Sequence, residues 1–366
     1  MAAFDPARLT QARHLAGLTK SALAQQVGVS AAAVGQWEAS TTPPRPDHLQ
    51  RAAEVLDVPI DFFALGRPYA QVDASAAHFR SLRSTRAAQR AKAIAFVEQT
   101  WELAYALEKR VQLPPVDLPG FSGGEIHHDD FPIDPVEAAR ALRSHWGLGE
   151  GPIPHLVRAM ENHGLIVTLV PFAGADTPRI DAFSTSRLPR PLVVLTPDRA
   201  DDVYRHRFTA AHEVGHLLLH SDTAPGDHQQ EREADLFAAE LLTPCHVIRP
   251  LLPTKLDFIA LSEVSRTWGV SLMSLIYRSR ELGLLSDATA RRAYQRINQM
   301  EKLGLILPEP VANYPGETPC LLSKAFALAE THGLSYSVLA RELRWRIPRL
   351  RLLLGEADTR PALRLV

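Results

Sequence analysis

Apolar side chains recur at helical spacing along most of the chain and at strand spacing in one central segment. Leu9, Ala12 and Ala16 form one apolar stripe near the N-terminus, and residues 202–220 and 228–243 form two long helical patterns. Stretches that are rich in β-branched residues or bounded by Pro predict strands at 165–172, 181–186 and 191–197. The predicted fold is therefore mainly α with a small β-sheet.

Breaks in this pattern divide the chain into four parts. A stretch with several Pro and Gly residues, 113–124, separates a long helix from the segment that holds the strands. The predicted parts are an all-α bundle at 1–70, a helical linker at 71–115, an α+β domain at 120–300 and a helical C-terminal region at 301–366.

The composition is typical of a folded protein. Of the 366 residues, 46% are hydrophobic and 22% are charged, which excludes a wholly disordered chain and a fibrous repeat. Two cysteines are too few for a disulfide scaffold or a four-cysteine zinc site, and they agree with a reducing cytosol. The N-terminus lacks the features of a signal peptide, and no apolar run reaches the roughly 20 residues of a membrane helix. We therefore expect a cytoplasmic protein with no membrane partner.

The net charge of −1 conceals an uneven distribution. Residues 1–70 carry six basic and six acidic side chains, residues 71–115 carry seven and four, residues 335–366 carry seven and three, and 116–334 is acidic. Four arginines of the linker share one face of a predicted helix: Arg80, Arg83, Arg86 and Arg90. This stripe is either a solvated face or a surface that contacts phosphates or another subunit.

The clearest chemical pattern is His212-Glu213-Val214-Gly215-His216, an HExxH match within a helical segment. His212 and His216 are one turn apart on the same helix face, about 6 Å between Cβ atoms, so both imidazoles can bind one Zn²⁺. Glu213 lies beside them and is the candidate catalytic base that takes a proton from the attacking water. The motif also arises by chance, and a catalytic metal requires a third protein ligand.

Two carboxylates downstream can supply this ligand. Glu231 and Asp235 are four residues apart and share a face at the start of the helix predicted at 228–243. We assign Glu231 as the third metal ligand. Asp235 is expected to accept the free N–H of a ligating histidine, an ExxxD spacing that resembles the thermolysin-like arrangement. Glu233 is the reserve ligand, and the alternative is a solvated acidic helix start, which the helix dipole favours.

His220 and the predicted strand 181–186 each allow two interpretations. The distance between His212 and His220, about 12 Å of helix rise, excludes both from binding one ion if the helix is continuous. His220 is expected to end the helix or to line a pocket, with donation to a developing oxyanion as the lesser alternative. The strand is either an edge that pairs with an extended peptide substrate or an ordinary core strand.

Residues 19–38 match the geometry of a helix-turn-helix. Gly28 supplies the tight turn, and Ser30 caps the helix that would enter the major groove. The sequence GLTKSALAQQVGVSAAAVGQWEAS and the following LQRAAEVLDVPIDFFALG resemble the Cro/repressor-type (XRE-family) helix-turn-helix over roughly residues 7–66. The resemblance implies that residues 1–70 bind double-stranded DNA.

On this resemblance, the outer face of 30–36 reads bases, while Lys20 and the helix caps hold phosphates. The candidate DNA-binding residues are Lys20, Ser30, Ala31, Ala32 and Gln36. Residues 30–38 carry no Lys or Arg, so the alanines can contact only thymine methyl groups and Gln36 can pair with adenine. A glycine that the family has near the helix end is Ser40 in this chain. The alternative is a helix-turn-helix used only for protein contact or dimerisation.

The second half of the chain, roughly 135–300, resembles the ImmA/IrrE family of metallopeptidases. The resemblance rests on RFTAAHEVGHLLLH (207–220), EREADLFAAELLTP (231–244) and VSRTWGVSLMSLIYRSRELGLLS (264–286). It implies a zincin-like fold in which His212, His216 and Glu231 bind the metal. Zn²⁺ is the expected cofactor, with Mn²⁺ or Fe²⁺ as alternatives, because this set of ligands does not select zinc by affinity alone. The family's usual LLMP is LLTP in this chain.

The two resemblances together imply regulated proteolysis. The expected protein is a zinc-dependent endopeptidase and transcriptional regulator. It would cleave a repressor-like DNA-binding protein and so induce a stress, phage or mobile-element response. The alternative is a DNA-binding regulator whose peptidase-like domain acts as a sensor or structural module. Paired half-sites in DNA favour a homodimer.

Overall fold

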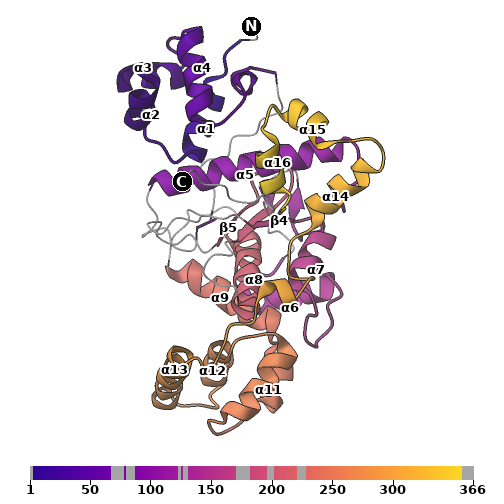
Figure 1. The fold of residues 1–366 in the computed structure, drawn as a ribbon. Coiled ribbons are helices and arrows are strands. Elements are labelled where there is room, and N and C mark those ends of the chain that lie inside the picture. The colour runs from indigo at the N-terminus through magenta and orange to yellow at the C-terminus, as the bar shows by residue number, and fades with distance from the viewer. Residues whose placement is uncertain are drawn as a thin grey trace. The chain divides into compact units, whose positions relative to one another are not determined.

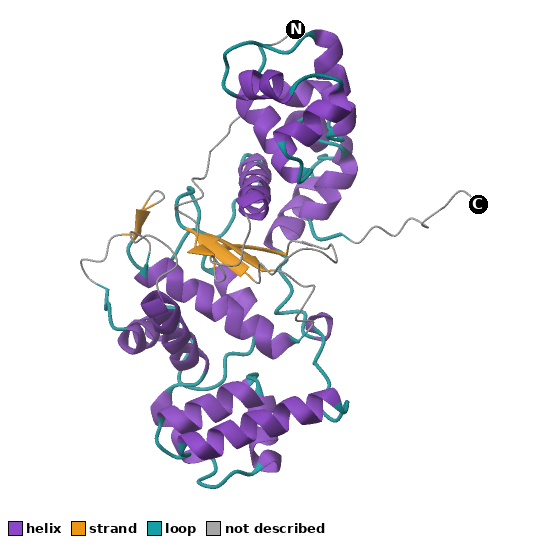
Figure 2. Cartoon of the chain, turned by 90° about the vertical axis from the view of Figure 1, so that its left-hand side faces the viewer, coloured by secondary structure: helices purple, strands orange, loops and turns teal. Residues whose placement is uncertain are grey.

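The computed structural model describes residues 3–66, 78–79, 87–122, 125–126, 131–169, 182–195, 202–220 and 228–356. Helices dominate these residues, and the strands form one small sheet and a short two-stranded ribbon (Figures 1 and 2). The predicted fold class, mainly α with a small sheet, is confirmed. None of the helices in the described ranges has the length and apolar character that crossing a bilayer requires.

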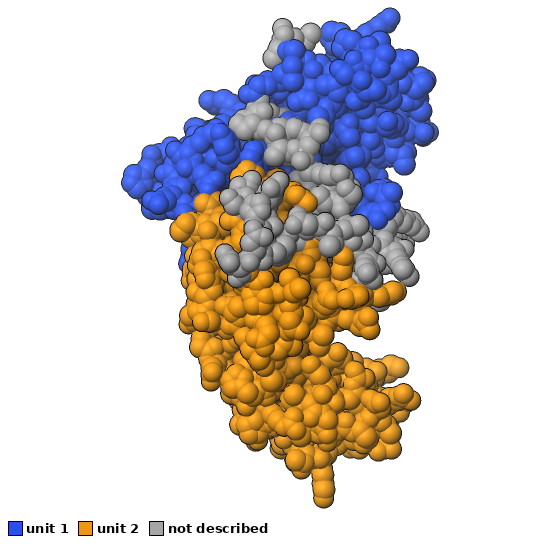
Figure 3. All heavy atoms as spheres, turned by 180° about the vertical axis from the view of Figure 1, so that it is seen from behind, with its two compact units in different colours: residues 1–74, 84–113, 320–366 blue, residues 75–83, 114–319 orange. Residues whose placement is uncertain are grey.

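The chain separates into two compact units, coloured differently in Figure 3. The first unit combines residues 1–74, 84–113 and 320–366, and the second combines 75–83 with 114–319. The four-part division into 1–70, 71–115, 120–300 and 301–366 stays a prediction. The first unit brings together segments from the two ends of the chain that the sequence pattern treats as separate parts.

The N-terminal helices of the first unit form the predicted helix-turn-helix. They are α1 (Pro6–Leu15), α2 (Lys20–Val27), α3 (Ala31–Glu38), α4 (Pro46–Val55) and the 3₁₀ helix η1 (Ile60–Phe63). Thr19 caps α2 by accepting the Ala22 N–H at 3.1 Å, and Ser30 caps α3 by accepting the Ala33 N–H at 3.1 Å. Between the two helices Gly28 has φ +81°, a conformation that glycine adopts at low cost.

Ser40, which follows α3, has a backbone conformation that favours glycine. Its φ is +60°, in the left-handed region that costs a residue with a Cβ about 1 kcal/mol or more. The chain therefore ends α3 with a strained serine where a glycine would be relaxed.

A long helix of the first unit, α5 (Ala87–Glu108), packs on α1 through buried polar groups. Arg8 of α1 forms a buried ion pair with Glu102, and the Gln11 amide donates to Glu98 at 3.2 Å. A buried ion pair is costly to break from one side, so these contacts specify how α1 lies on α5. Arg90 lies on this helix, whereas Arg80, Arg83 and Arg86 of the predicted arginine stripe lie outside the described residues.

The C-terminal helices also belong to the first unit: α14 (Leu321–Glu330), α15 (Tyr336–Leu343) and α16 (Ile347–Leu353). Both α14 and α15 pack on α5. The Arg344 guanidinium donates to the carbonyl oxygens of Ala64 at 2.9 Å and of Asp61 and Leu65 at 3.3 Å. These bonds tie the C-terminal region to the end of the helix-turn-helix bundle.

The second unit contains the sheet, with strand order β1-β5-β6-β4. Its strands are β1 (His78–Phe79), β4 (Ile166–Leu169), β5 (Ala182–Thr185) and β6 (Leu192–Leu195), and the separate ribbon is β2 (Phe121–Ser122) with β3 (Glu125–Ile126). β6 pairs in parallel with β4, Ile166 opposite Leu192, and antiparallel with β5, Ala182 opposite Leu195. The three predicted strands are confirmed, and the β1 pairing adds a fourth.

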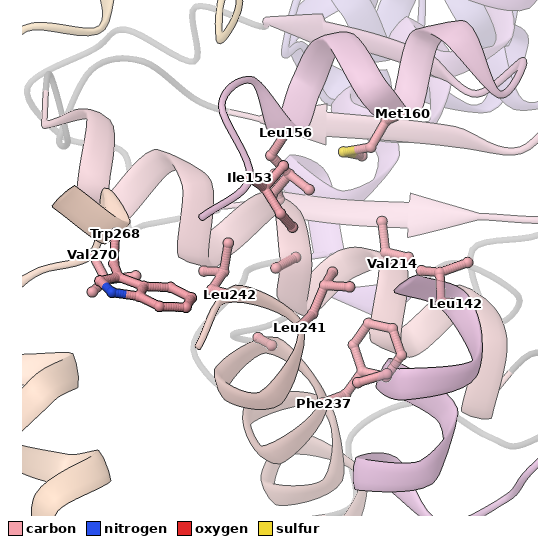
Figure 4. Packing of buried hydrophobic residues seen from close by; sticks show 14 of the residues in the cluster. Leu142, Ile153, Leu156, Met160, Val214, Phe237, Leu241, Leu242, Trp268 and Val270 are labelled. Carbon is pink, nitrogen blue, oxygen red and sulfur yellow. The ribbon is translucent and has the colours of Figure 1, made fainter. Parts of the chain in front are cut away.

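Helices of the second unit surround this sheet and the main hydrophobic core. They are α6 (Pro135–His145), α7 (Leu156–Asn162), α8 (Val203–Leu219), α9 (His228–Leu242), α10 (Cys245–Ile248), η4 (Arg249–Leu251), α11 (Phe258–Trp268), α12 (Leu272–Glu281), α13 (Asp287–Lys302) and η5 (Val311–Asn313). α8 packs against β5 and β6 on one side and against α9 on another. Leu142, Val214 and Phe237, from α6, α8 and α9, meet in the core (Figure 4). The core therefore fixes α8 and α9 side by side.

Candidate metal centre

Gly215 allows α8 and α9 to approach closely. A Cβ at this position would lie 3.0 Å from Phe237 Cδ1 and 3.3 Å from the Ala234 Cα atom, both on α9. Both distances are shorter than ordinary carbon contacts, so a side chain at 215 would push the helices apart. The glycine inside the HExxH motif thus allows α9 to pack close to the part of α8 that carries the two histidines.

Three donor groups from these helices converge on one point. The Nε2 atoms of His212 and His216 are 3.0 Å apart. The two carboxylate oxygens of Glu231 lie 3.6 Å from His212 Nε2 and 3.4 Å from His216 Nε2. Ligand atoms bound tetrahedrally to one ion at 2.0–2.1 Å lie about 3.3 Å from one another. The donor set therefore fits a divalent metal, and the three predicted ligands are together, although their binding of a metal stays a prediction.

The electrostatics of the cluster agree with a cation site. Burial raises the pKa of Glu231, but the interactions of its carboxylate with the side chains of His212 and His216 outweigh burial and lower that pKa to about 2. Burial is also the main cause that lowers the pKa of His216. A charged carboxylate and neutral imidazoles are the protonation states that bind metals.

Asp235 occupies the position predicted for a supporting residue. Its Oδ1 lies 2.8 Å from His212 Nδ1, so the carboxylate accepts that ring N–H and the Nε2 lone pair of His212 faces Glu231 and His216. The predicted contact of Asp235 with a ligating histidine is present, and its role in metal binding stays a prediction.

Glu213, the predicted catalytic base, has a partner that the sequence did not indicate. The Ser184 hydroxyl on β5 donates to Glu213 Oε2 at 2.7 Å, and both residues are fully buried. A hydroxyl in a strand of small residues carries no sequence signal that separates this role from ordinary packing. Only the pairing of β5 with its neighbours brings Ser184 to α8.

The interpretation of 181–186 as an open edge for substrate is wrong. β1 pairs antiparallel with β5, with His78 opposite Ser184 and Phe79 opposite Phe183, and β6 occupies the other side. β5 is therefore an interior strand. It supports the candidate base rather than offering its backbone to a peptide.

The reserve ligand Glu233 lies outside the donor cluster. Its Oε2 is 2.9 Å from Nε2 of His220. His220 ends α8 as its C-terminal cap, as one of its two interpretations predicted. A second group of potential ligands, Glu240 with Cys245 and His246, is less suited to a metal because its carboxylate binds two guanidinium groups, those of Arg140 and Arg278.

The candidate DNA-binding residues lie together on the helix-turn-helix. Ser30, Ala31, Ala32 and Gln36 are all exposed at the start and on the outer face of α3, and Lys20 is exposed at the start of α2. The Lys20 ammonium lies 3.4 Å from a Glu38 oxygen. The arrangement presents the predicted surface, and contact of these residues with DNA stays a prediction.

Comparison with known proteins finds two family models that match parts of the chain. Residues 160–280 match the model of the IrrE N-terminal-like domain, a peptidase family, and residues 9–63 match the helix-turn-helix model. No curated protein matches the chain. Both resemblances drawn from the sequence are confirmed, and the order of the two matches is the predicted one. In N-to-C order, the chain thus has a segment similar to XRE-type helix-turn-helix domains and a segment similar to the IrrE/ImmA-like peptidase family.

Proposed function

We propose that the chain is a zinc-dependent endopeptidase that cleaves a repressor-type DNA-binding protein and thereby regulates transcription. The observation that carries the proposal is the convergence of His212, His216 and Glu231 beside the buried carboxylate of Glu213. The match of this segment to a peptidase family supports the same activity.

The three donors would hold the metal through two imidazole nitrogens and one carboxylate. This set suits Zn²⁺, and Mn²⁺ or Fe²⁺ are the alternatives because geometry and availability, rather than affinity alone, decide between these ions. When bound, the ion acts as a Lewis acid that polarises the peptide carbonyl.

Glu213 carries the proton chemistry of the proposed reaction. Its carboxylate takes a proton from the water whose oxygen attacks the peptide carbonyl carbon, and it returns that proton to the amine nitrogen as the C–N bond breaks. The hydrogen bond from Ser184 holds Oε2 in one orientation. The burial of Glu213 keeps bulk water away from the carboxylate.

The helix-turn-helix would direct the chain to double-stranded DNA or to the repressor bound there. The exposed face of Ser30, Ala31, Ala32 and Gln36 supports base contacts, and exposed Lys20 supports a phosphate contact. Paired half-sites would suit a homodimer. Neither Cys245 nor Cys320 is in a disulfide, which together with a DNA partner supports a cytoplasmic location.

A second candidate function is a DNA-binding regulator that does not cleave protein. The exposed outer face of α3 favours it independently of the metal centre. Footprinting at the gene's own promoter, before and after metal removal, separates the two. Protection of DNA with no cleavage of any repressor would favour the second candidate.

The test of the first candidate is a cleavage assay with defined metal content. The chain is stripped with a chelator, reloaded with Zn²⁺, Mn²⁺ or Fe²⁺, and incubated with a repressor-type protein encoded by a neighbouring gene. We expect cleavage at one site with reloaded protein and none with stripped protein. Cleavage that is equal with and without metal would overturn the proposal.

A further inference from the structure

His220 and Glu233 form a chain of contacts that starts at the Nδ1 atom of His216. His216 Nδ1 lies 3.0 Å from His220 Nδ1, and His220 Nε2 lies 2.9 Å from Glu233 Oε2. The other oxygen of Glu233 accepts the Gln229 amide at 2.8 Å. Both histidines are buried. A line of polar groups therefore leads from His216 to the exposed end of α9.

The chemistry of these groups fixes the direction of each hydrogen bond. An ionised carboxylate only accepts, so His220 donates its Nε2–H to Glu233. A neutral imidazole that is protonated on Nε2 accepts at Nδ1, so His220 accepts the Nδ1–H of His216. The Nε2 lone pair of His216 then faces the Nε2 of His212 and the Glu231 carboxylate, which are the other two donors of the cluster.

We propose that His220, held by Glu233, is the positioning residue that orients His216 for metal binding. Asp235 has the equivalent place on His212, where a carboxylate accepts the ring N–H directly. Such outer partners fix the tautomer and the ring orientation of a ligating histidine. The inference rests on the proposed metal site, and it assigns a function to two residues outside the donor cluster.

The contacts of His220 argue against the other roles considered for it. Both ring nitrogens are within 3.0 Å of a partner, His216 on one side and Glu233 on the other. Donation of the Nε2–H to an oxyanion would require His220 to leave Glu233. Direct binding of a metal through Nδ1 would require it to leave His216.

The test measures metal affinity rather than proteolysis. Zn²⁺ binding to the full chain is measured by competition with a chromophoric chelator for the wild type, His220→Phe and His220→Gln. Phe keeps the ring volume but removes both nitrogens, whereas Gln can still accept from His216 and donate to Glu233. We expect His220→Phe to bind Zn²⁺ about 10- to 100-fold more weakly and His220→Gln to bind near the wild-type level.

The matched control is His228→Phe, at an exposed histidine that begins α9, which should bind Zn²⁺ like the wild type. Circular dichroism verifies that each variant is folded. If His220→Phe does not fold, the Zn²⁺ affinities of Glu233→Leu and Glu233→Gln are compared instead. Leu removes the acceptor of the His220 hydrogen bond, whereas Gln keeps an acceptor. If a folded variant that lacks these hydrogen bonds binds Zn²⁺ as tightly as the wild type, this inference is wrong but the proposed function is not affected. If the wild type binds no Zn²⁺, the proposed function is wrong as well.

Discussion

The hydroxyl of Ser184 lies 2.7 Å from Oε2 of Glu213, and it joins the central sheet to the helix that carries the HExxH motif. Ser184 Oγ is also 3.3 Å from the Glu213 carbonyl oxygen. Because β5 is fixed between β1 and β6, this contact ties the orientation of the candidate base to the sheet. A change in the sheet that leaves the metal ligands intact can therefore still disturb the base.

Substitution Ser184→Ala should slow cleavage with little effect on metal content. A positioned general base contributes roughly 10²–10⁴ in rate, and we expect the loss of its orientation to remove about tenfold of that. The measurement is kcat on the cleaved repressor, together with elemental analysis. Ser186→Ala, two residues along the same buried segment, is the control and should keep the wild-type rate. Equal rates in both variants would refute a positioning role for Ser184.

The low pKa of Glu231 predicts acid sensitivity of the metal-free protein. Its folded pKa of about 2 is below the ordinary 4.5, so the unfolded state binds this proton more tightly. The resulting stability is fully present above about pH 4.5 and is lost as the pH falls toward 2. The difference in free energy of unfolding between the wild type and Glu231→Gln, measured in chelator, should shrink across that window. A difference that stays constant would contradict the assigned pKa.

Glu317 is predicted to be critical for the stability of the second unit. Its buried carboxylate accepts the N–H groups of Leu156 at 2.9 Å and Val157 at 3.1 Å, and it pairs with buried Arg207. Glu317→Ala leaves Arg207 without this partner, which should cost about 3–5 kcal/mol. Denaturant unfolding measures the loss. The control Glu263→Ala, at an exposed glutamate of α11, should change stability by less than about 0.5 kcal/mol.

Gln36 is the residue of α3 best suited to read a base. It is exposed, and a Gln that bonds adenine contributes about 1–3 kcal/mol of discrimination. Gln36→Ala should therefore weaken binding to the preferred sequence, obtained by selection from random DNA, by roughly ten- to a hundredfold. Gln50→Ala, on the exposed face of α4, is the control. Unchanged affinity and sequence preference in Gln36→Ala would favour a helix-turn-helix that contacts only protein.

Local signals in the sequence were sufficient for the elements that carry the site. The helices predicted at 202–220 and 228–243 are α8 and α9 within a residue at each end, because periodicity and capping act over a few residues. The same turn sequence occurs again before α12. Gly269 has φ +64° and Ser271 caps α12, which repeats the Gly-Val-Ser sequence of the helix-turn-helix.

Contacts between distant segments could not be read from the sequence. The bond from Ser184 to Glu213 spans 29 positions, and the bonds from Arg344 to the carbonyl oxygens of 61–65 span 279 or more. In the sequence, Ser184 looks like any serine of a packed strand, and Arg344 looks like any exposed arginine. The contact between Glu233 and His220 was also not predicted. Helical spacing shows that Glu233 lies on a different face of the helix from Glu231, but it does not show which residue Glu233 contacts.

The substitution Glu213→Gln tests the central claim most directly. Gln keeps the size of the side chain and a hydrogen-bond acceptor, but it cannot take a proton at neutral pH. The account predicts that Glu213→Gln binds zinc with the wild-type stoichiometry and cleaves the repressor at least about 10²-fold more slowly. Undiminished cleavage by a folded, zinc-loaded Glu213→Gln protein would contradict the account.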